Sequence, residues 1–170
     1  MGAKVIAAAS TEEKVNLCKQ HGADEGFVYP TGKLDRDQQK ELSAKIKELT
    51  GGMGANVVYD PVGDSYSEPC IRATAWDGRY LVIGFAAGEI PKIPINLALL
   101  KGMKIVGVFW GAWVGMNPEE NKKNFEELFK LHSESKIDPE VSDSFSLDDG
   151  AKAISHLKDR KAKGKVIITM

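Results

Sequence analysis

The sequence predicts an α/β fold built on a doubly wound parallel sheet with helices on both faces. Short apolar runs rich in β-branched residues alternate along the chain with helical patterns, and this alternation is typical of strands joined by right-handed crossovers. The runs are apolar on both faces, as expected for strands that helices cover on both sides. The 170 residues, 42% of them hydrophobic, suffice for one domain with a substantial core.

Five apolar runs predict the strands of the sheet. Each is short and bounded by turn residues or by a helical pattern. The predicted strands are Ala3–Ala9, Phe27–Tyr29, Ala55–Tyr59, Arg79–Ile83 and Met103–Phe109.

The segments between the strands predict helices over Thr11–His21, Leu34–Leu49, Ser65–Ala75 and Pro118–His132. In the second of these, Leu42, Ile46 and Leu49 recur at spacings of four and three, which places them on one helical face. Ser10 and Glu13 predict a capping box at the start of the first helix. Pro118 suits the first position of the last helix, and Gly22 suits the end of the first.

The composition shifts near Ser133, and the remaining tail has its own pattern. It is extended at Val141–Phe145, helical over Leu147–Lys158 and strand-like at Lys165–Thr169. We therefore predict two parts, a sheet domain over residues 1–135 and a C-terminal segment over residues 136–170 that belongs to a second domain.

Charge and cysteine content exclude several classes of function. The formal net charge of −1 gives no reason to expect nucleic acid or an anionic membrane as partner. Cys18 and Cys70 do not form a CxxC pair and are too few for a structural zinc site. We expect buried or half-buried thiols in a reducing compartment, the cytoplasm or, in a eukaryote, the mitochondrial matrix. No apolar run reaches 18 residues, and no signal peptide is visible.

Ligands of open α/β sheets bind beyond the carboxyl ends of the strands, so these positions are the candidate site. The first strand ends at Ser10, where a dinucleotide fold meets the adenosine ribose. An acidic residue there favours NAD, whereas Ser10 with Lys14 one turn later leaves room for a 2′-phosphate. Alternatively, Ser10 is only a helix cap and Lys14 only a surface lysine, and the anionic Glu12 and Glu13 weigh against phosphate binding.

The next two strand ends carry an aromatic residue and a glycine. Tyr29 either stacks on adenine or is a partly buried loop tyrosine. Gly63, after Pro61 and Val62, lets the backbone approach a ligand closely. The side chain of Asp60, just before them, could instead cap the following helix.

Glycines and aromatics follow the last two strands. Gly84–Gly88 leaves room for a flat ring, against which Phe85 could pack. Gly107–Gly111 offers backbone hydrogen bonds for a carboxamide and aromatics to line a ring pocket. Core packing and turn chemistry are the alternative for both.

One glycine cluster and the histidines give no site. Gly51–Gly54 fails the GxGxxG spacing and precedes a strand, so we expect a turn there. The three histidines fall on separate predicted helices, and no serine lies in a GxSxG motif. We therefore predict neither a catalytic set nor a metal site within this chain.

Taken in order, several stretches resemble one family. They are GAKVIAAASTEEK, HGADEGFVY, GANVVYDPVGDSY, WDGRYLVIGFAAGEIPKIPINLALLKGMKIVGVFWGAW and GKVIIT. They look like the zinc-free quinone oxidoreductases of the zeta-crystallin type, in the medium-chain dehydrogenase/reductase superfamily. IGFAAGEIP and VGVFWG are most similar to the quinone oxidoreductase-like 2 group. The likeness is collinear over nearly the whole chain.

The resemblance implies an NADPH-dependent enzyme that reduces small-molecule quinones or conjugated enones and is usually a homodimer, paired edge to edge near Met103–Phe109. It implies that the 2′-phosphate meets Ser10 and Lys14, and that Tyr29 contacts the adenosine. It assigns the ribose and pyrophosphate to Val62 and Gly63. The nicotinamide side falls to Gly84, Phe85 and Ala86, and the carboxamide contacts to Val108, Phe109 and Trp110.

The chain departs from that family at its start. Family members place a catalytic domain, a strand, a glycine-rich loop and a helix before the stretch that resembles GAKVIAAAS. In the strand order 3-2-1-4-5-6, the first strand is central, between the Ala3–Ala9 and Ala55–Tyr59 strands. We therefore expect a fragment, inactive alone, in which another polypeptide fills the gap, the edges close up, or strands swap between copies. The alternatives to quinone reduction are a non-catalytic Rossmann-like binding module and another medium-chain alcohol dehydrogenase or reductase.

Overall fold

The computed structural model describes residues 2–170, and the contacts divide the chain into two compact units, Met1–Trp110 and Gly111–Met170. These units divide the chain earlier than residue 135, where the sequence suggests the boundary between two domains. The structural division concerns packing alone, so the boundary between a cofactor-binding part and a catalytic part stays a prediction.

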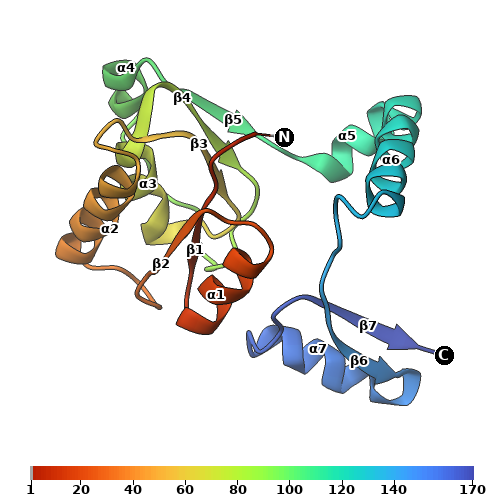
Figure 1. Cartoon of the computed structure of the whole chain (residues 1–170). Helices are drawn as coiled ribbons and strands as arrows, with labels where there is room; N and C mark the ends of the chain where they lie inside the picture. Colours follow the sequence, from red (N-terminus) through yellow and green to blue (C-terminus); the bar gives the residue numbers. More distant parts are fainter. Residues whose placement is uncertain (1) are drawn as a thin grey trace. The chain divides into compact units, whose positions relative to one another are not determined.

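The first unit contains five strands, and every pairing between them is parallel. The strands are β1 (Ile6–Ala9), β2 (Glu25–Val28), β3 (Ala55–Asp60), β4 (Thr74–Val82) and β5 (Lys104–Gly107). β1 pairs with β2, and β3, β4 and β5 form a second sheet in that order (Figure 1). The predicted parallel α/β architecture is confirmed.

A break separates β1 from β3. Within the described residues these two strands belong to different sheets and do not pair with each other. The break lies where the resemblance places the central first strand, so this part of the fold prediction is confirmed, and the edges have not closed up. One core cluster spans the break, because Ile6 of β1 and Val62 after β3 both pack against it.

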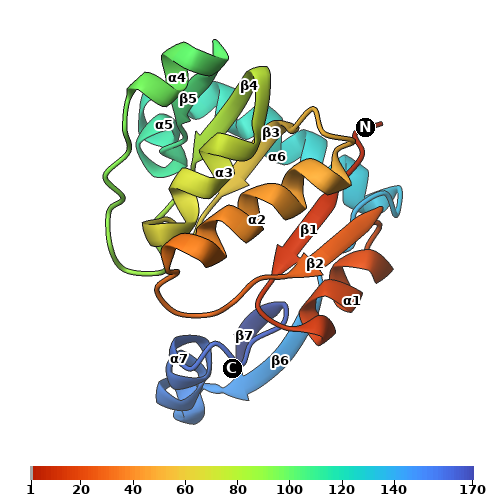
Figure 2. The ribbon, with the colours of Figure 1, turned by 90° about the vertical axis from the view of Figure 1, so that its left-hand side faces the viewer.

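Helices cover the strands of the first unit. They are α1 (Glu12–Gln20), α2 (Arg36–Leu49), α3 (Ser67–Ala73) and α4 (Asn96–Lys101). α2 and α3 lie side by side in front of the strands (Figure 2), and α1 contacts β1 and β2. Ile71 of α3 packs with Tyr80 of β4, Leu97 of α4 and Met103, all of them buried. The short α4 has too few residues for a clear helical period, and the sequence analysis missed it.

The hydroxyl that caps α1 differs from the predicted one. Thr11 is the N-cap, with extended φ and ψ of −146° and 153°, and its Oγ1 accepts a hydrogen bond from Lys14 N. The predicted N-cap is therefore wrong by one position, and the capping box predicted for Ser10 and Glu13 is wrong, because the side chain of Lys14, at the third helical position, cannot accept a hydrogen bond. The correction leaves Ser10 just before the cap, where its hydroxyl is available for another role.

This assignment predicts unequal effects for two alanine substitutions. Thr11→Ala removes a cap and is expected to lower the free energy of unfolding by about 1 kcal/mol. Ser10→Ala removes a hydroxyl outside the helix and is expected to lower it by less than about 0.5 kcal/mol. Urea denaturation of both variants measures the difference, and equal losses would contradict the assignment.

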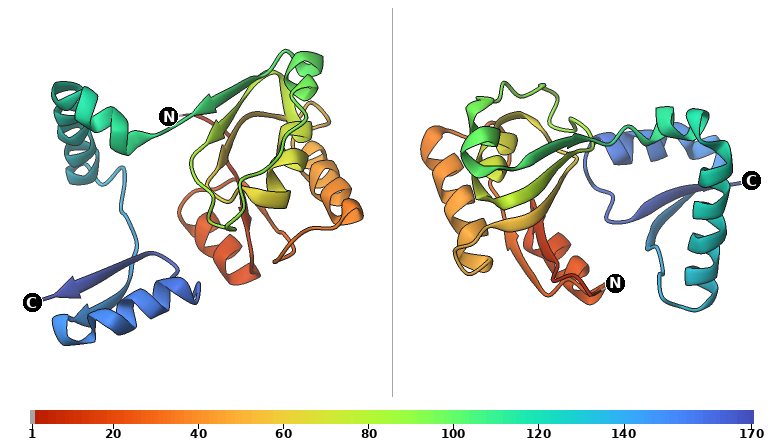
Figure 3. Two further views of the ribbon diagram at one scale, coloured as in Figure 1. Left: turned by 180° about the vertical axis from the view of Figure 1, so that it is seen from behind. Right: turned by 90° about the horizontal axis from the view of Figure 1, so that it is seen from above.

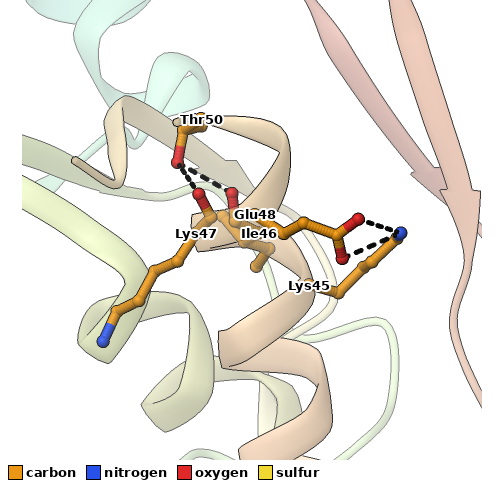
Figure 4. Close-up of polar contacts among 5 residues, drawn as sticks. All are labelled: Lys45, Ile46, Lys47, Glu48 and Thr50. Atoms are coloured by element: carbon orange, nitrogen blue, oxygen red, sulfur yellow. Dashed lines mark hydrogen bonds and ion pairs between the residues drawn. The ribbon is translucent and has the colours of Figure 1, made fainter. Parts of the chain in front are cut away.

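Both ends of α2 are fixed by side chains. At its start, Asp35 and Gln38 form a reciprocal capping box that the sequence analysis missed. At its end, the hydroxyl of Thr50 donates to the carbonyls of Ile46 at 2.8 Å and Lys47 at 3.1 Å (Figure 4). The following Gly51–Gly54 stretch is the predicted turn into β3, with positive φ at three of its four residues.

The second unit consists of two helices and a strand–helix–strand segment (Figure 3). Its elements are α6 (Pro118–Ser133), β6 (Val141–Ser146), α7 (Gly150–Lys158) and β7 (Lys165–Thr169), preceded by α5 (Trp110–Met116), which begins at the last residue of the first unit. The strand, helix and strand that the tail pattern predicts are all present, and β6 pairs with β7 in parallel. Pro118 occupies the first turn of α6, as predicted. Among residues 2–170, no helix has both the length and the apolar character needed to cross a bilayer.

Candidate functional site

The loops after β2, β3 and β4 meet at one core cluster. Its buried members are Phe27, Leu34, Leu42 and Tyr66, and the half-buried residues packed on it include Tyr29, Val62 and Ala87. The rings of Tyr29 and Tyr66 meet edge to face, with centroids 5.2 Å apart and an interplanar angle of 66°. Three of the predicted strand-end regions are therefore brought together, as parallel strands require.

Residues 61–64 after β3 and residues 83–89 after β4, which we name the paired loops, are joined by backbone hydrogen bonds. Ile83 N donates to Asp60 O, Ala86 N to Pro61 O at 3.0 Å, and Ala87 N to Val62 O at 2.9 Å. Asp64 N donates to Glu89 O at 3.2 Å. The two loops thus hold each other, and a displacement of one displaces the other.

Gly63 has a backbone conformation that only glycine adopts readily. Its φ is 74° and its ψ is −151°. A Cβ built on Gly63 would lie 2.8 Å from Phe85 Cδ1 and 3.2 Å from Phe85 Cα. The glycine therefore allows the close contact between the paired loops, whereas the sequence analysis explained it by the approach of a ligand.

Asp60 does not cap the following helix, which resolves one of the alternatives left open by the sequence. Its Oδ1 accepts from the backbone N–H groups of Val62 at 2.8 Å and Gly63 at 3.0 Å. Its Oδ2 accepts from Ser67 Oγ at 3.0 Å and from the hydroxyl of Tyr80. Burial, together with the hydrogen bond to Asp60, raises the pKa of Tyr80 above its usual value, so this hydroxyl remains a donor.

Ser10 and Lys14 lie at the carboxyl end of β1, and both are half-buried. The strand ends at Ala9, whose carbonyl accepts from Tyr29 N at 3.0 Å, so Ser10 and Tyr29 follow two paired strand ends. Lys14 belongs to the first turn of α1, whose N–H groups and dipole favour an anion. The hydroxyl of Ser10, the ammonium of Lys14 and the backbone N–H groups at the start of α1 are groups that bind phosphate well.

The end of β5 contributes less to this convergence. Val108 N donates to Val82 O at 3.0 Å, which aligns Val108 with the end of β4. Phe109 and Trp110 are 79% and 57% exposed and lie outside the core cluster described above. Phe109 and Trp110 therefore do not pack against the other candidate residues. Those residues lie toward the carboxyl ends of the strands: Ser10, Lys14, Tyr29, Val62, Gly63 and residues 84–86.

Residues 1–133, which include every candidate site residue, match the zinc-binding dehydrogenase family. The chain belongs to that family. This membership describes the sequence and the fold, and it does not by itself imply a bound metal ion. Within the part of the chain that the structure describes, no three His, Cys, Asp or Glu residues gather in a group suited to a metal ion.

Within this dehydrogenase family, the chain is similar to curated relatives of the predicted group. It is 36% identical over 168 residues to a quinone oxidoreductase-like protein 2 homolog of Nematostella vectensis, covering 98% of this chain and 44% of the relative. It is also 36% identical to the Bos taurus quinone oxidoreductase-like protein 2, covering 99% of this chain and 46% of that protein. The predicted resemblance is confirmed, and the chain spans about half the length of the curated relatives it matches.

A solved structure has the same architecture over the length of this chain. A mycobacterial protein, solved in complex with NADPH, superposes with a TM-score of 0.85 at 27% identity. The match covers 99% of this chain and 50% of the mycobacterial one. The strands and helices described above therefore have the arrangement found in about half of that solved chain.

Side chains that hold the site together were missed at the sequence level. The hydroxyl of Tyr66 lies 2.8 Å from Pro30 O and 2.7 Å from Gly32 O, and Leu34 N donates to Ser65 Oγ at 2.9 Å. These contacts tie the loop after β2 to the 3₁₀ turn η1 (Asp64–Tyr66). They join residues more than thirty positions apart, so no local sequence pattern reveals them.

The two thiols of the chain differ in environment. Cys18 is exposed, whereas Cys70 packs partly buried beside Ile71 and Tyr80. Burial, and then the charge of Asp60, raises the pKa of the Cys70 thiol to about 12. Cys70 is thus a protonated packing residue, as predicted, whereas the prediction of a buried or half-buried thiol is wrong for the exposed Cys18.

The raised pKa of Cys70 gives a pH prediction. The unfolded thiol loses its proton near pH 9, whereas the folded thiol keeps it to about pH 12. The unfolded state therefore binds fewer protons in this window, and the free energy of unfolding should fall as the pH rises from about 9 to about 12. Urea denaturation at several pH values measures the slope. Cys70→Ala should flatten it, and an unchanged slope in this variant would contradict the prediction.

Proposed function

We propose that the protein is an oxidoreductase that transfers a hydride from NADPH to a quinone or a conjugated enone. The observation that carries the proposal is the convergence of the loops after β1, β2, β3 and β4 at the carboxyl edge of parallel strands, where dinucleotides bind in such folds. Because the chain covers about half of its relatives, the activity is proposed for the protein in its full natural length.

The residues present suit such a cofactor. The ammonium of Lys14 and the hydroxyl of Ser10, at the first turn of α1, match the chemistry of a 2′-phosphate. Lys14 contributes a point charge, which discriminates NADPH from NADH without demanding a fixed geometry. Tyr29 offers a ring edge for the adenosine, although its contact with Tyr66 also gives it a packing role.

The paired loops serve the other end of the cofactor. Gly84 and Ala86 are small, and Phe85 between them is 40% exposed. These residues suit a flat nicotinamide ring, and Val62 and Gly63 would contact the ribose and pyrophosphate. Val108, Phe109 and Trp110 are proposed for the carboxamide side and the substrate cleft.

The bound cofactor supplies the hydride, and the protein contributes position and the exclusion of water. Quinone reduction leaves an oxyanion that water protonates, so the reaction demands no strong general acid. The proposal therefore assigns no catalytic residue to this chain. We propose that residues 1–135 form the cofactor-binding part and that residues 136–170 return to the catalytic part.

Steady-state oxidation of NADPH by a simple benzoquinone or an enone tests this proposal. The loss of reduced-nicotinamide absorbance should depend on the quinone or enone and should be faster with NADPH than with NADH. Oxidation of an alcohol in the reverse direction, without quinone reduction, would favour another dehydrogenase chemistry. Binding of neither nucleotide would favour a non-catalytic Rossmann-like module.

We also propose that the protein forms a homodimer through the β5 edge. β5 is the outer strand of its sheet, and Ile105 and Val106 are 39% and 36% exposed. An exposed apolar strand edge is a ready template for pairing with a second copy. Light scattering should give twice the chain mass, and a monomer at micromolar concentration would contradict this.

In a fragment without its central strand, the same measurement would reveal strand swapping as a concentration-dependent species.

A further inference from the structure

Asp60 is a buried carboxylate that has no direct part in the proposed reaction. Its residue surface is only 6% exposed, and it lies at the carboxyl end of β3, next to the paired loops. Four donors surround it, the N–H groups of Val62 and Gly63 and the hydroxyls of Ser67 and Tyr80. Buried polar oxygens need hydrogen-bond partners, and here each carboxylate oxygen accepts two hydrogen bonds.

The four partners come from three different elements. Val62 and Gly63 belong to the loop after β3, Ser67 begins α3, and Tyr80 lies in the middle of β4. The carboxylate therefore joins the loop to a helix and to the neighbouring strand. Ser67 and Tyr80 are themselves buried, and their hydrogen bonds to Oδ2 fix the orientation of the carboxylate. The other oxygen, Oδ1, is therefore held in one position, where it accepts from the loop.

The loop then transmits this position to the other paired loop. Gly63 touches Phe85, and Pro61 and Val62 accept hydrogen bonds from Ala86 and Ala87. Two N–H groups pointing at one carboxylate oxygen also turn the Val62 and Gly63 peptides in a defined direction. Without that acceptor the loop would lose its orientation, and Gly84–Ala86 would follow it.

We propose that Asp60 is a positioning residue that sets the paired loops for the nicotinamide half of the cofactor. The proposal rests on the proposed NADPH-dependent function and deepens it. In this proposal the two ends of the site are held by different parts of the fold. The end at Ser10 and Lys14 is held by β1 and α1, and the paired loops are held by Asp60.

The test compares two ligands and uses the full-length protein. NADPH spans both ends of the site, whereas adenosine 2′,5′-bisphosphate carries the 2′-phosphate and lacks the nicotinamide. Asp60→Ala should raise the Kd for NADPH by about tenfold or more and should change the Kd for adenosine 2′,5′-bisphosphate by less than about threefold. The shift in nicotinamide fluorescence on binding should shrink in parallel.

Conservative and control variants complete the test. Asp60→Asn keeps one oxygen for Val62 and Gly63 and turns an amide toward two hydroxyls that are able to accept, so NADPH binding should recover to within about threefold of wild type. Asp77→Asn makes the same chemical change at an exposed aspartate paired with Lys104, and should leave both affinities unchanged. Circular dichroism checks folding, and Asp60→Ser replaces Asp60→Ala if the latter does not fold.

The outcomes separate this proposal from the proposed function. A selective loss for NADPH, restored by Asp60→Asn, supports the positioning role. Equal losses for both ligands would reduce Asp60 to a structural residue, and unchanged affinities in a folded Asp60→Ala or Asp60→Ser variant would also overturn the proposal. If the wild-type protein itself fails to bind NADPH, the proposed function fails, whatever Asp60 does.

Discussion

Gly63→Ala is expected to lower the free energy of unfolding by about 3 kcal/mol and to weaken NADPH binding at least about tenfold. Two effects add. The φ of 74° with ψ of −151° strains any residue that has a Cβ, and the added methyl would lie 2.8 Å from Phe85 Cδ1. Relief of this overlap requires the paired loops to separate, which moves the residues proposed for the nicotinamide. Urea denaturation and fluorescence titration measure the two losses.

Gly52→Ala is the matched control. Gly52 also has a positive φ, 84°, but no atom lies within 4 Å of a Cβ built on it. Its replacement should cost about 1 kcal/mol from backbone strain alone and should leave NADPH binding unchanged. Equal effects of the two substitutions would show that the contact with Phe85 has no importance for the site.

Lys14→Glu is expected to weaken NADPH binding by about a hundredfold, because it removes a cation from the 2′-phosphate and adds an anion. NADH has no phosphate at this position, so its Kd should change by less than about threefold. The variant should remain folded, as thermal denaturation would show. Lys14 is half-buried in the first turn of α1, and a glutamate in the first turn interacts favourably with the helix dipole. Titration of the variant with both nucleotides gives the measurement.

Lys122→Glu supplies the control for that charge reversal. Lys122 is an exposed residue of α6, and the same change of charge there should leave both affinities as in wild type. A loss of NADPH affinity in both variants would point to the net charge of the protein. An unchanged NADPH affinity in Lys14→Glu would remove the phosphate role of Lys14.

Much of the fold follows from local pattern. The strands and the longer helices repeat apolar residues at periods that the backbone geometry dictates, and α2 and α6 begin within two residues of their predicted starts. β4 begins earlier than predicted, at Thr74, because a bulge with positive φ at Asp77 lets Thr74 pair with Ala55 before the main register starts. Such a bulge depends on the partner strand and has no local signature.

The candidate site was predictable by position but only partly by role. The carboxyl ends of parallel strands are fixed by topology, so Ser10, Tyr29, Gly63 and Phe85 could be selected in advance. The role of Asp60 could not, because its partners Ser67 and Tyr80 come from a later helix and strand. Sequence spacing does not show which hydroxyl contacts a buried carboxylate. The helix cap was also misplaced by one residue, since Thr11 and not Ser10 caps α1.

Amide hydrogen exchange of the full-length protein, with and without saturating NADPH, tests most directly that the strand-end loops form one cofactor site. The account predicts slower exchange at residues 10–14, 62–64 and 84–87 on addition of NADPH, and with NADH a smaller effect at residues 10–14. Slower exchange confined to other parts of the chain, or no change in these three segments at a saturating concentration, would contradict it.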